Sequence, residues 1–205
     1  MRVPLVLLAF PERTDRHRDG PINRPVRRWR TAIDFVSHGL WGGIAFGRRS
    51  RKAFLAAIGI SLLPDLLGEG ALGLLTLLDV AGMPGWEHGH PNLTDYPPWA
   101  QTFYNVTHSL VVFAVVFGAV WLLARKPVWI MGAWGLHILI DIPTHAIDLF
   151  PTPFLWPLSD YKFDGVAWHH PLVFAANAGL LAAAYGGYWL WRRRKGVAAR
   201  RGDRP

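Results

Sequence analysis

The sequence predicts an all-α protein whose helices form a polytopic transmembrane bundle. Three observations support this prediction: long stretches with almost no charge, clusters of Lys and Arg between those stretches, and ionisable side chains at matching depths inside them. A helix that spans a membrane needs about 20 predominantly apolar residues. Four stretches reach that length and one is shorter, so we expect four full-length helices plus one shorter N-terminal helix.

Charge content delimits the expected helices. Residues 100–124 and 171–191 contain no Asp, Glu, Lys or Arg, and residues 127–147 contain Asp141 as their one charged side chain. A stretch this poor in charge is typical of a membrane helix. The expected short first helix covers 31–46, and the full-length helices cover 53–78, 100–124, 127–147 and 171–191.

The net charge of +8 arises largely from cationic clusters at the ends of the apolar stretches. Clusters at 48–52, 125–126 and 192–195 all fall on one side if the path alternates, and the positive-inside rule makes that side cytoplasmic. This distribution favours the lipid bilayer as a partner and argues against nucleic acid. Residues 192–205 are then a basic cytoplasmic tail.

The N-terminal tail does not follow the same rule. Residues 1–30 contain eight Arg and several Pro, and we expect them to be disordered or interfacial, preceding a membrane-embedded domain over 31–191. Five crossings place this tail outside. Three explanations stay open: the tail is an exception, the first segment is re-entrant, or the true start lies downstream.

The fourth apolar stretch contains His137, Asp141 and His145, spaced four residues apart. On an α-helix such positions lie along one face. Ionisable groups in apolar surroundings are costly and persist mainly where they have partners or a function. The chain has no Cys, so any metal must be held by imidazoles, carboxylates and water. The triplet therefore predicts a metal site.

Other stretches place polar groups near the same depth. At about 1.5 Å per residue, Asp65 and His108 lie about 18 Å above the basic face, and Asp141 lies about 21 Å above it. Taken singly, each residue has a structural alternative as a helix cap or a packed histidine, but the convergence favours one shared site in the outer half. The candidate metal ligands are His38, Asp65, His108, His137, Asp141 and His145, and the candidate catalytic residues are Asp65 and Glu69.

Spacing within the triplet bears on the number of ions. His137 and His145 are about 12 Å apart along a helix axis, too far to bind one ion. Asp141, between them, can bridge two ions, which in two-metal hydrolytic sites lie about 3.5–4 Å apart. We therefore expect one or two divalent ions, with two favoured. Zinc suits these ligands, and Mn or Fe accept the same groups.

The motifs together resemble a family of bacterial inner-membrane metal-dependent hydrolases that is distantly related to zinc-dependent phospholipase C. The resemblance covers about residues 31–170 and implies hydrolysis by a multi-pass inner (plasma) membrane protein whose active face is extracytoplasmic. Many relatives have a His-Arg-Gly lead-in where this chain has Phe103-Tyr104-Asn105, which puts one auxiliary ligand or phosphate-binding charge in doubt. The matching features are His38, Leu63-Pro64-Asp65, Thr107-His108-Ser109, His137 through His145, and the run Phe150–Leu158.

Two classes of function follow from these residues. The first is a membrane-bound metal-dependent hydrolase that acts on a lipid-borne or membrane-adjacent ester, most readily a phosphoester. A metal lowers the pKa of its bound water to about 7, and Asp65 or Glu69 would orient that water or take its proton.

The alternative is a non-catalytic membrane protein, either an ion or metal transporter or a haem-bearing electron carrier. Haem could be held by His108 with His137 or His145, but the neighbouring carboxylates argue against it. Histidines in the connecting loops are weaker candidates whose roles stay open: His88, His90, His169 and His170.

Overall fold

The computed structural model describes the backbone of residues 28–78, 96–147 and 150–202. Every regular element in these residues is a helix, which confirms the predicted all-α class. Most of the expected N-terminal tail lies outside the described residues. The elements are α1 (Arg28–Phe46), α2 (Arg51–Asp65), the π-helix η2 (Leu66–Gly70), α3 (Ala71–Leu77), α4 (Pro98–Thr107), α5 (Leu110–Ala124), the 3₁₀ helix η5 (Trp129–Met131), α6 (Gly132–Thr144) and α7 (Pro171–Gly202).

The expected full-length helices are mostly interrupted. The stretch 53–78 is divided among α2, η2 and α3, the stretch 100–124 between α4 and α5, and α6 has only 13 residues. Only 171–191 lies within one unbroken helix, α7, which continues through the basic residues to Gly202. Among the described helices none is by itself long and apolar enough to cross a membrane, whereas α4 and α5, bent by 61°, meet that requirement together.

The first break lies just after Pro64, a residue inside α2. Proline has no N–H to donate, and its ring clashes with the preceding helical turn. The α-helix ends at Asp65, and the N–H of Leu66 is shared between the carbonyls of Leu62 and Leu63. The chain then widens into the π-helix η2, a feature often found at functional sites.

The second break separates α4 from α5 at His108. Ser109 has an extended backbone, and its hydroxyl accepts the N–H of Val112 at 3.1 Å, which caps the start of α5. The N–H of Leu110 donates to the carbonyl of Phe154 at 3.0 Å. The segment that contains Phe154 therefore braces this break.

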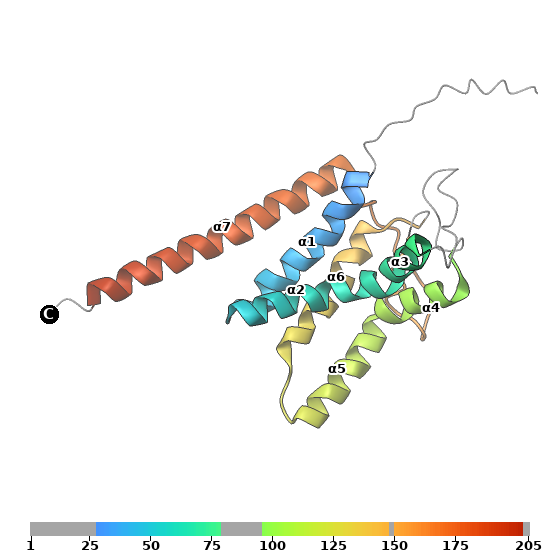
Figure 1. Cartoon of the computed structure of the whole chain (residues 1–205), viewed down its shortest axis with the longest axis horizontal. Coiled ribbons are helices and arrows are strands. Elements are labelled where there is room, and N and C mark those ends of the chain that lie inside the picture. Colours follow the sequence, from blue (N-terminus) through green and yellow to red (C-terminus); the bar gives the residue numbers. More distant parts are fainter. Residues whose placement is uncertain (1–27, 79–95, 148–149, 203–205) are drawn as a thin grey trace, which may run out of the picture.

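Close packing of α1 on α2 sets the position of His38. A Cβ on Gly42 would lie 2.5 Å from Cβ of Ser61, so only glycine allows this approach. The hydroxyl of Ser61 donates to the carbonyl of His38 at 2.7 Å. The helix α6 packs against both α1 and α2, and α4 packs against η2, whereas α7 lies beside α1 and extends away from the bundle (Figure 1).

Several polar side chains are buried, and several large apolar side chains are exposed to the outside of the bundle. Among the described residues, nine polar or charged residues are buried but only eight hydrophobic ones, apart from proline and glycine. Leu122 and Leu123 at the end of α5 are 77% and 84% exposed, and Leu172 at the start of α7 is 74% exposed. The apolar faces therefore point outward, and the polar side chains lie between the helices.

Candidate metal centre

Five of the six predicted ligands meet between four helices. His38 comes from α1, Asp65 from the last position of α2, His108 from the end of α4, and His137 and Asp141 from successive turns of α6. Four of these side chains are at most 2% exposed, and Asp65 is 25% exposed. The two helix breaks place Asp65 and His108 at the same point as the α6 pair.

Asp65, His108 and His137 form one compact group. The Oδ1 atom of Asp65 lies 3.3 Å from Nε2 of His108 and 3.4 Å from Nε2 of His137. The two Nε2 atoms are 3.2 Å apart. Three potential ligand atoms thus form a nearly equilateral triangle.

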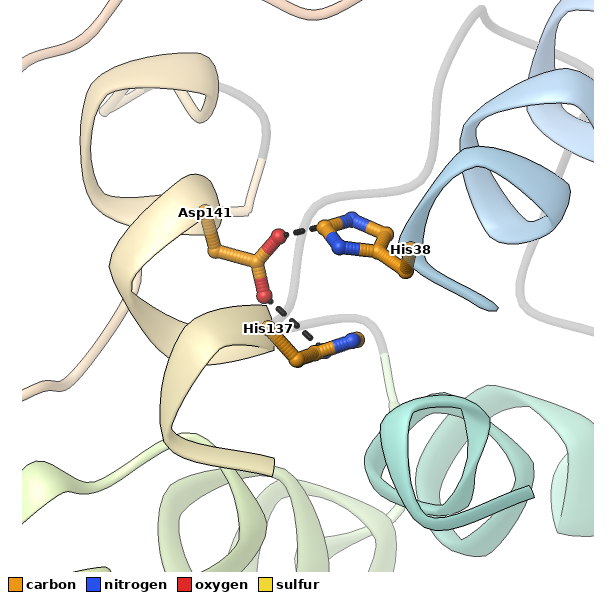
Figure 2. A group of neighbouring side chains, drawn as sticks. All are labelled: His38, His137 and Asp141. Atoms are coloured by element: carbon orange, nitrogen blue, oxygen red, sulfur yellow. Dashed lines mark ion pairs between the residues drawn. The ribbon is translucent and has the colours of Figure 1, made fainter. Parts of the chain in front are cut away.

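Asp141 connects this group to His38. Its Oδ2 atom lies 3.0 Å from Nε2 of His137 and 3.5 Å from Nε2 of His108, while its Oδ1 atom lies 3.0 Å from Nε2 of His38. Figure 2 shows this carboxylate between the rings of His38 and His137. One carboxylate therefore presents separate oxygens to two sets of imidazoles, as a bridging ligand does.

The separations fit a divalent metal. Zinc is bound by His and carboxylate at about 2.0–2.2 Å, so neighbouring ligand atoms in a tetrahedral site lie about 3.3 Å apart. The triangle of Asp65, His108 and His137 has this size. The residues that the structure describes include two groups that could hold a metal ion, this triangle and the set of His38, His137 and Asp141.

Hydrogen bonds prepare His108 for this role. Its Nδ1 atom lies 3.1 Å from the carbonyl oxygen of Tyr104, which can only accept, so Nδ1–H is the donor. In the neutral ring, Nε2 then carries the lone pair that points into the cluster. The ring of Tyr104 stacks on His108 with centroids 4.1 Å apart, and its hydroxyl donates to the carbonyl of Phe150 at 3.0 Å.

The electrostatics of the cluster also require a cation. Asp141 is 1% exposed, and its two oxygens each lie 3.0 Å from an imidazole nitrogen, one of His38 and one of His137. A buried carboxylate without compensation costs several kcal/mol. Protonated imidazoles or a metal ion would supply the positive charge, and the facing Nε2 atoms of His108 and His137 would repel if both were protonated.

His145 lies beside the cluster and belongs to neither group. Its Nδ1 atom is 3.6 Å from Oδ1 of Asp141 and 3.1 Å from the Asp141 carbonyl oxygen. His145 directly follows the last residue of α6: its N–H still donates to the Asp141 carbonyl at 3.0 Å, whereas its own backbone is extended. The chain there is held to a later segment, since the N–H of Gly165 donates to the His145 carbonyl at 2.9 Å.

The remaining candidates are placed only in part. Glu69 lies on η2, one turn beyond Asp65, but its side chain is outside the described residues, as are His88 and His90. Nδ1 of His170 accepts the N–H of Leu172 at 3.3 Å at the start of α7. Neither group of possible ligands includes His169 or His170.

Sequence reasoning missed the residues that position the ligands. Tyr104 stands four residues before His108 on α4, a spacing that itself predicts contact on a helix. The indole N–H of Trp134 donates to the carbonyl of Thr107 at 2.6 Å and so ties α6 to the α4–α5 break. No local signal in the sequence indicates that second contact.

An apolar cavity of about 470 Å³ lies beside α6, between α1 and α7. Thr144 and Asn177, two polar side chains in its wall, already have hydrogen-bond partners. The hydroxyl of Thr144 donates to the carbonyl of Ile140, and the amide oxygen of Asn177 accepts the indole N–H of Trp41. The wall is therefore suited to an apolar occupant. It includes Trp41, Ile140, Pro143, Val173, Phe174 and Leu180.

Comparisons of the chain with protein-family models, with curated proteins and with solved structures found no match. What the protein does is therefore inferred from its own residues and their geometry.

Proposed function

We propose that this protein is a membrane-embedded metal-dependent hydrolase that acts on a lipid-borne or membrane-adjacent ester, most readily a phosphoester. The observation that carries the proposal is the cluster of two carboxylates and three imidazoles, whose separations suit a divalent ion. Zinc is the preferred ion, and Mn or Fe are the alternatives. Asp141, with one oxygen toward each set of imidazoles, would allow one or two ions.

The residues have distinct roles in this proposal. A divalent ion in such a site supplies Lewis acidity, which polarises an ester and activates water. His108 and His137 would hold it through Nε2, and Asp141 would balance its charge. Asp65 would supply the third ligand atom beside those of His108 and His137, and as the most exposed member of the cluster it is also placed to bind an incoming water and take its proton. Glu69, one turn away, is the second candidate for that role.

The outward-facing apolar surface supports the membrane as partner. The helix α5 is hydrophobic on all sides, yet none of its residues is buried. A helix with this composition is normally covered by protein or lipid. Breaks in helices at membrane depth are tolerated where they line a polar interior, as those at Asp65 and His108 do. We place the protein in a bacterial-type inner (plasma) membrane, with its active face extracytoplasmic.

The apolar cavity supports a substrate that carries an acyl chain. It lies against α6, whose neighbouring face presents His137 and Asp141 to the cluster. Its volume of about 470 Å³ falls in the usual range for small-molecule sites. An ester group at the cluster and a hydrocarbon chain in the cavity would use both features.

Metal content and turnover test the proposal together. We expect protein purified in detergent without chelators to contain one or two equivalents of Zn, Mn or Fe by elemental analysis. Chelation should abolish turnover of a phospholipid, phosphomonoester or carboxylester substrate, and the same metal should restore it. Fully metallated protein that turns over no member of these three substrate classes would contradict the hydrolase.

A metal or ion transporter is the second candidate, favoured by one observation. The helix α2 ends at Asp65 and α4 ends directly before His108, and discontinuous helices form the ion sites of many transporters. Metal flux into proteoliposomes without ester turnover would support this function. A haem carrier is not favoured, because Asp65 and Asp141 lie within 3.5 Å of the imidazole nitrogens that would ligate iron. A Soret band would reverse that judgement.

A further inference from the structure

Two cationic segments far apart in the sequence lie together in the structure. The α1–α2 turn contains Arg48, and α7 passes beside it (Figure 1). The hydroxyl of Tyr188 donates to the carbonyl of Arg48 at 3.4 Å, and one turn earlier the hydroxyl of Tyr185 donates to the carbonyl of Leu40 at 2.9 Å. These contacts hold the middle of α7 against α1 and the turn that follows it.

The resulting surface is strongly positive. Residues 48–52 contribute four cations and residues 192–195 contribute four more, all of them exposed. The sequence has no Asp or Glu in 35–64 or in 171–202. Among the described residues, no ion pair involves any of the eight. Their charge is therefore available to an external anion.

Tryptophan rings hold two of these cations at the border of the apolar part of α7. The Cζ atom of Arg193 lies 3.7 Å from the centroid of the Trp189 ring, and Nζ of Lys195 lies 4.4 Å from that of Trp191. Both rings are about half exposed. Indole rings beside Lys and Arg are typical of the headgroup level of a membrane.

We propose that the α1–α2 turn and residues 185–195 of α7 form one surface that binds the phosphates of anionic lipid headgroups. A bilayer fits better than a nucleic acid, because exposed apolar side chains directly adjoin the cations. Leu55 is 57% exposed and Leu190 is 50% exposed. Hydrocarbon would cover these side chains, whereas a nucleic acid would leave them in water. The proposal does not depend on the metal cluster.

The test compares anionic and zwitterionic lipid on the full-length protein. Detergent-purified protein is mixed with phosphatidylglycerol or phosphatidylcholine, and retained lipid is counted by native mass spectrometry. We expect a preference of about tenfold for phosphatidylglycerol, equivalent to one decade in the dissociation constant. Arg193→Gln/Lys195→Gln and Arg48→Gln/Arg49→Gln should each remove most of it. High salt should weaken it, because screening acts on exposed charges.

A matched control removes the same charge elsewhere. Arg125→Gln/Lys126→Gln neutralises two exposed cations between α5 and η5 and should leave most of the preference intact. Trp189→Leu/Trp191→Leu keeps every charge and should still lower the preference. Equal retention of both lipids, an equal loss in the control, or displacement of phosphatidylglycerol by an oligonucleotide would overturn the proposal. Metal content should be unchanged in all four variants, which separates this surface from the cluster.

Discussion

The helices that form the cluster and the helices that face outward are built in opposite ways. The helices α2 and α4 end at or next to their ligands, Asp65 and His108, and α6 ends one turn after Asp141. In contrast, α5, which begins just after the break at His108, and α7 contribute no member of the cluster and are not interrupted within their own lengths. Except for His38, within the unbroken helix α1, and His137, within α6, the cluster residues lie at or near helix ends, and long apolar runs mark the outer surface.

This arrangement departs from the pattern of a water-soluble domain in two respects. Such a domain buries Leu, Ile, Val and Phe and exposes charged residues. Here Asp141 and His137 are almost fully buried while Leu122 and Leu123 are largely exposed. Substitutions in the polar cluster and substitutions on the apolar surface can therefore be tested separately.

The largest effect is expected from Asp141→Asn. The amide keeps the shape of the side chain but removes the negative charge that offsets bound cations. Metal content should fall by at least one equivalent. Turnover should fall by about 100-fold or more, since even the loss of an outer-shell partner costs 10–100-fold. Elemental analysis and substrate turnover measure these two losses.

Asp160→Asn is the matched control, because Asp160 is exposed and outside both groups of possible ligands. It should change neither metal content nor turnover. A purely structural buried carboxylate makes the opposite prediction for Asp141→Asn. Unchanged metal content with an equal or higher Tm would show that Asp141 does not hold a metal.

Pro64→Ala should keep or raise the thermal stability but weaken metal binding. Removing proline from a helix interior relieves a cost of about 3 kcal/mol, which offsets the lost packing, so Tm should hold or rise. An unbroken α2 would move Asp65 away from His108, and metal affinity should fall by about 10–100-fold. The dissociation constant for zinc and a thermal melt measure the two effects.

Gly59→Ala controls for the gain in helix stability. A Cβ at Gly59 meets no atom within 4 Å, so alanine there should strengthen α2 without moving Asp65. Its metal affinity should equal that of the natural protein. If Pro64→Ala also binds zinc with unchanged affinity, the break is not what positions Asp65.

Val173→Trp should distinguish acyl-chain binding in the apolar cavity from ester hydrolysis at the cluster. The larger ring would fill space that we assign to an acyl chain. The KM for a long-chain substrate should rise by about tenfold, a cost of about 1.4 kcal/mol, while a short soluble ester should react normally. Leu172→Trp, at a neighbouring position that is 74% exposed, is the control and should affect neither substrate. Equal losses with both substrates would exclude the cavity from acyl binding.

The smallest effect is expected from Tyr104→Phe. The ring can still stack on His108, but the carbonyl of Phe150 loses its donor. The free energy of unfolding should fall by about 1–2 kcal/mol, with metal content unchanged. Tyr161→Phe, on a side chain that is 60% exposed, should leave the Tm unchanged. A loss of metal in Tyr104→Phe would mean that the hydroxyl itself, and not only the ring, positions His108.

Much of the cluster was predictable because it depends on regular geometry. The spacing of His137 and Asp141 needs only the helical repeat. The depths predicted for Asp65 and His108 count residues from near the start of α2 and of α4. The breaks come at or after these two residues, so they do not enter the count. His145, directly after the end of α6, lies 3.6 Å from Asp141 but belongs to neither group of possible ligands.

Other features depend on which helices pack together, which the chain does not encode locally. The contact of Asp65 with His108 joins residues 43 positions apart, and the Tyr188–Arg48 contact joins residues 140 apart. From the sequence alone, the segment Phe150–Leu158 stands out only as part of a family resemblance, yet its start is buried and the carbonyl of Phe154 accepts the N–H of Leu110. Only the assembled bundle shows that this segment supports the α4–α5 break.

The side chains of the cluster differ in solvent exposure, so the cluster is accessible from the side of Asp65. Asp65 is 25% exposed, while His38, His108, His137 and Asp141 are at most 2% exposed. In the proposed membrane-embedded protein, ions and solvent would therefore exchange past Asp65, from one side of the bilayer. In sealed vesicles, a chelator that cannot cross the lipid should remove metal only from molecules whose Asp65 side faces it. The fraction of metal removed would then report how the protein is oriented.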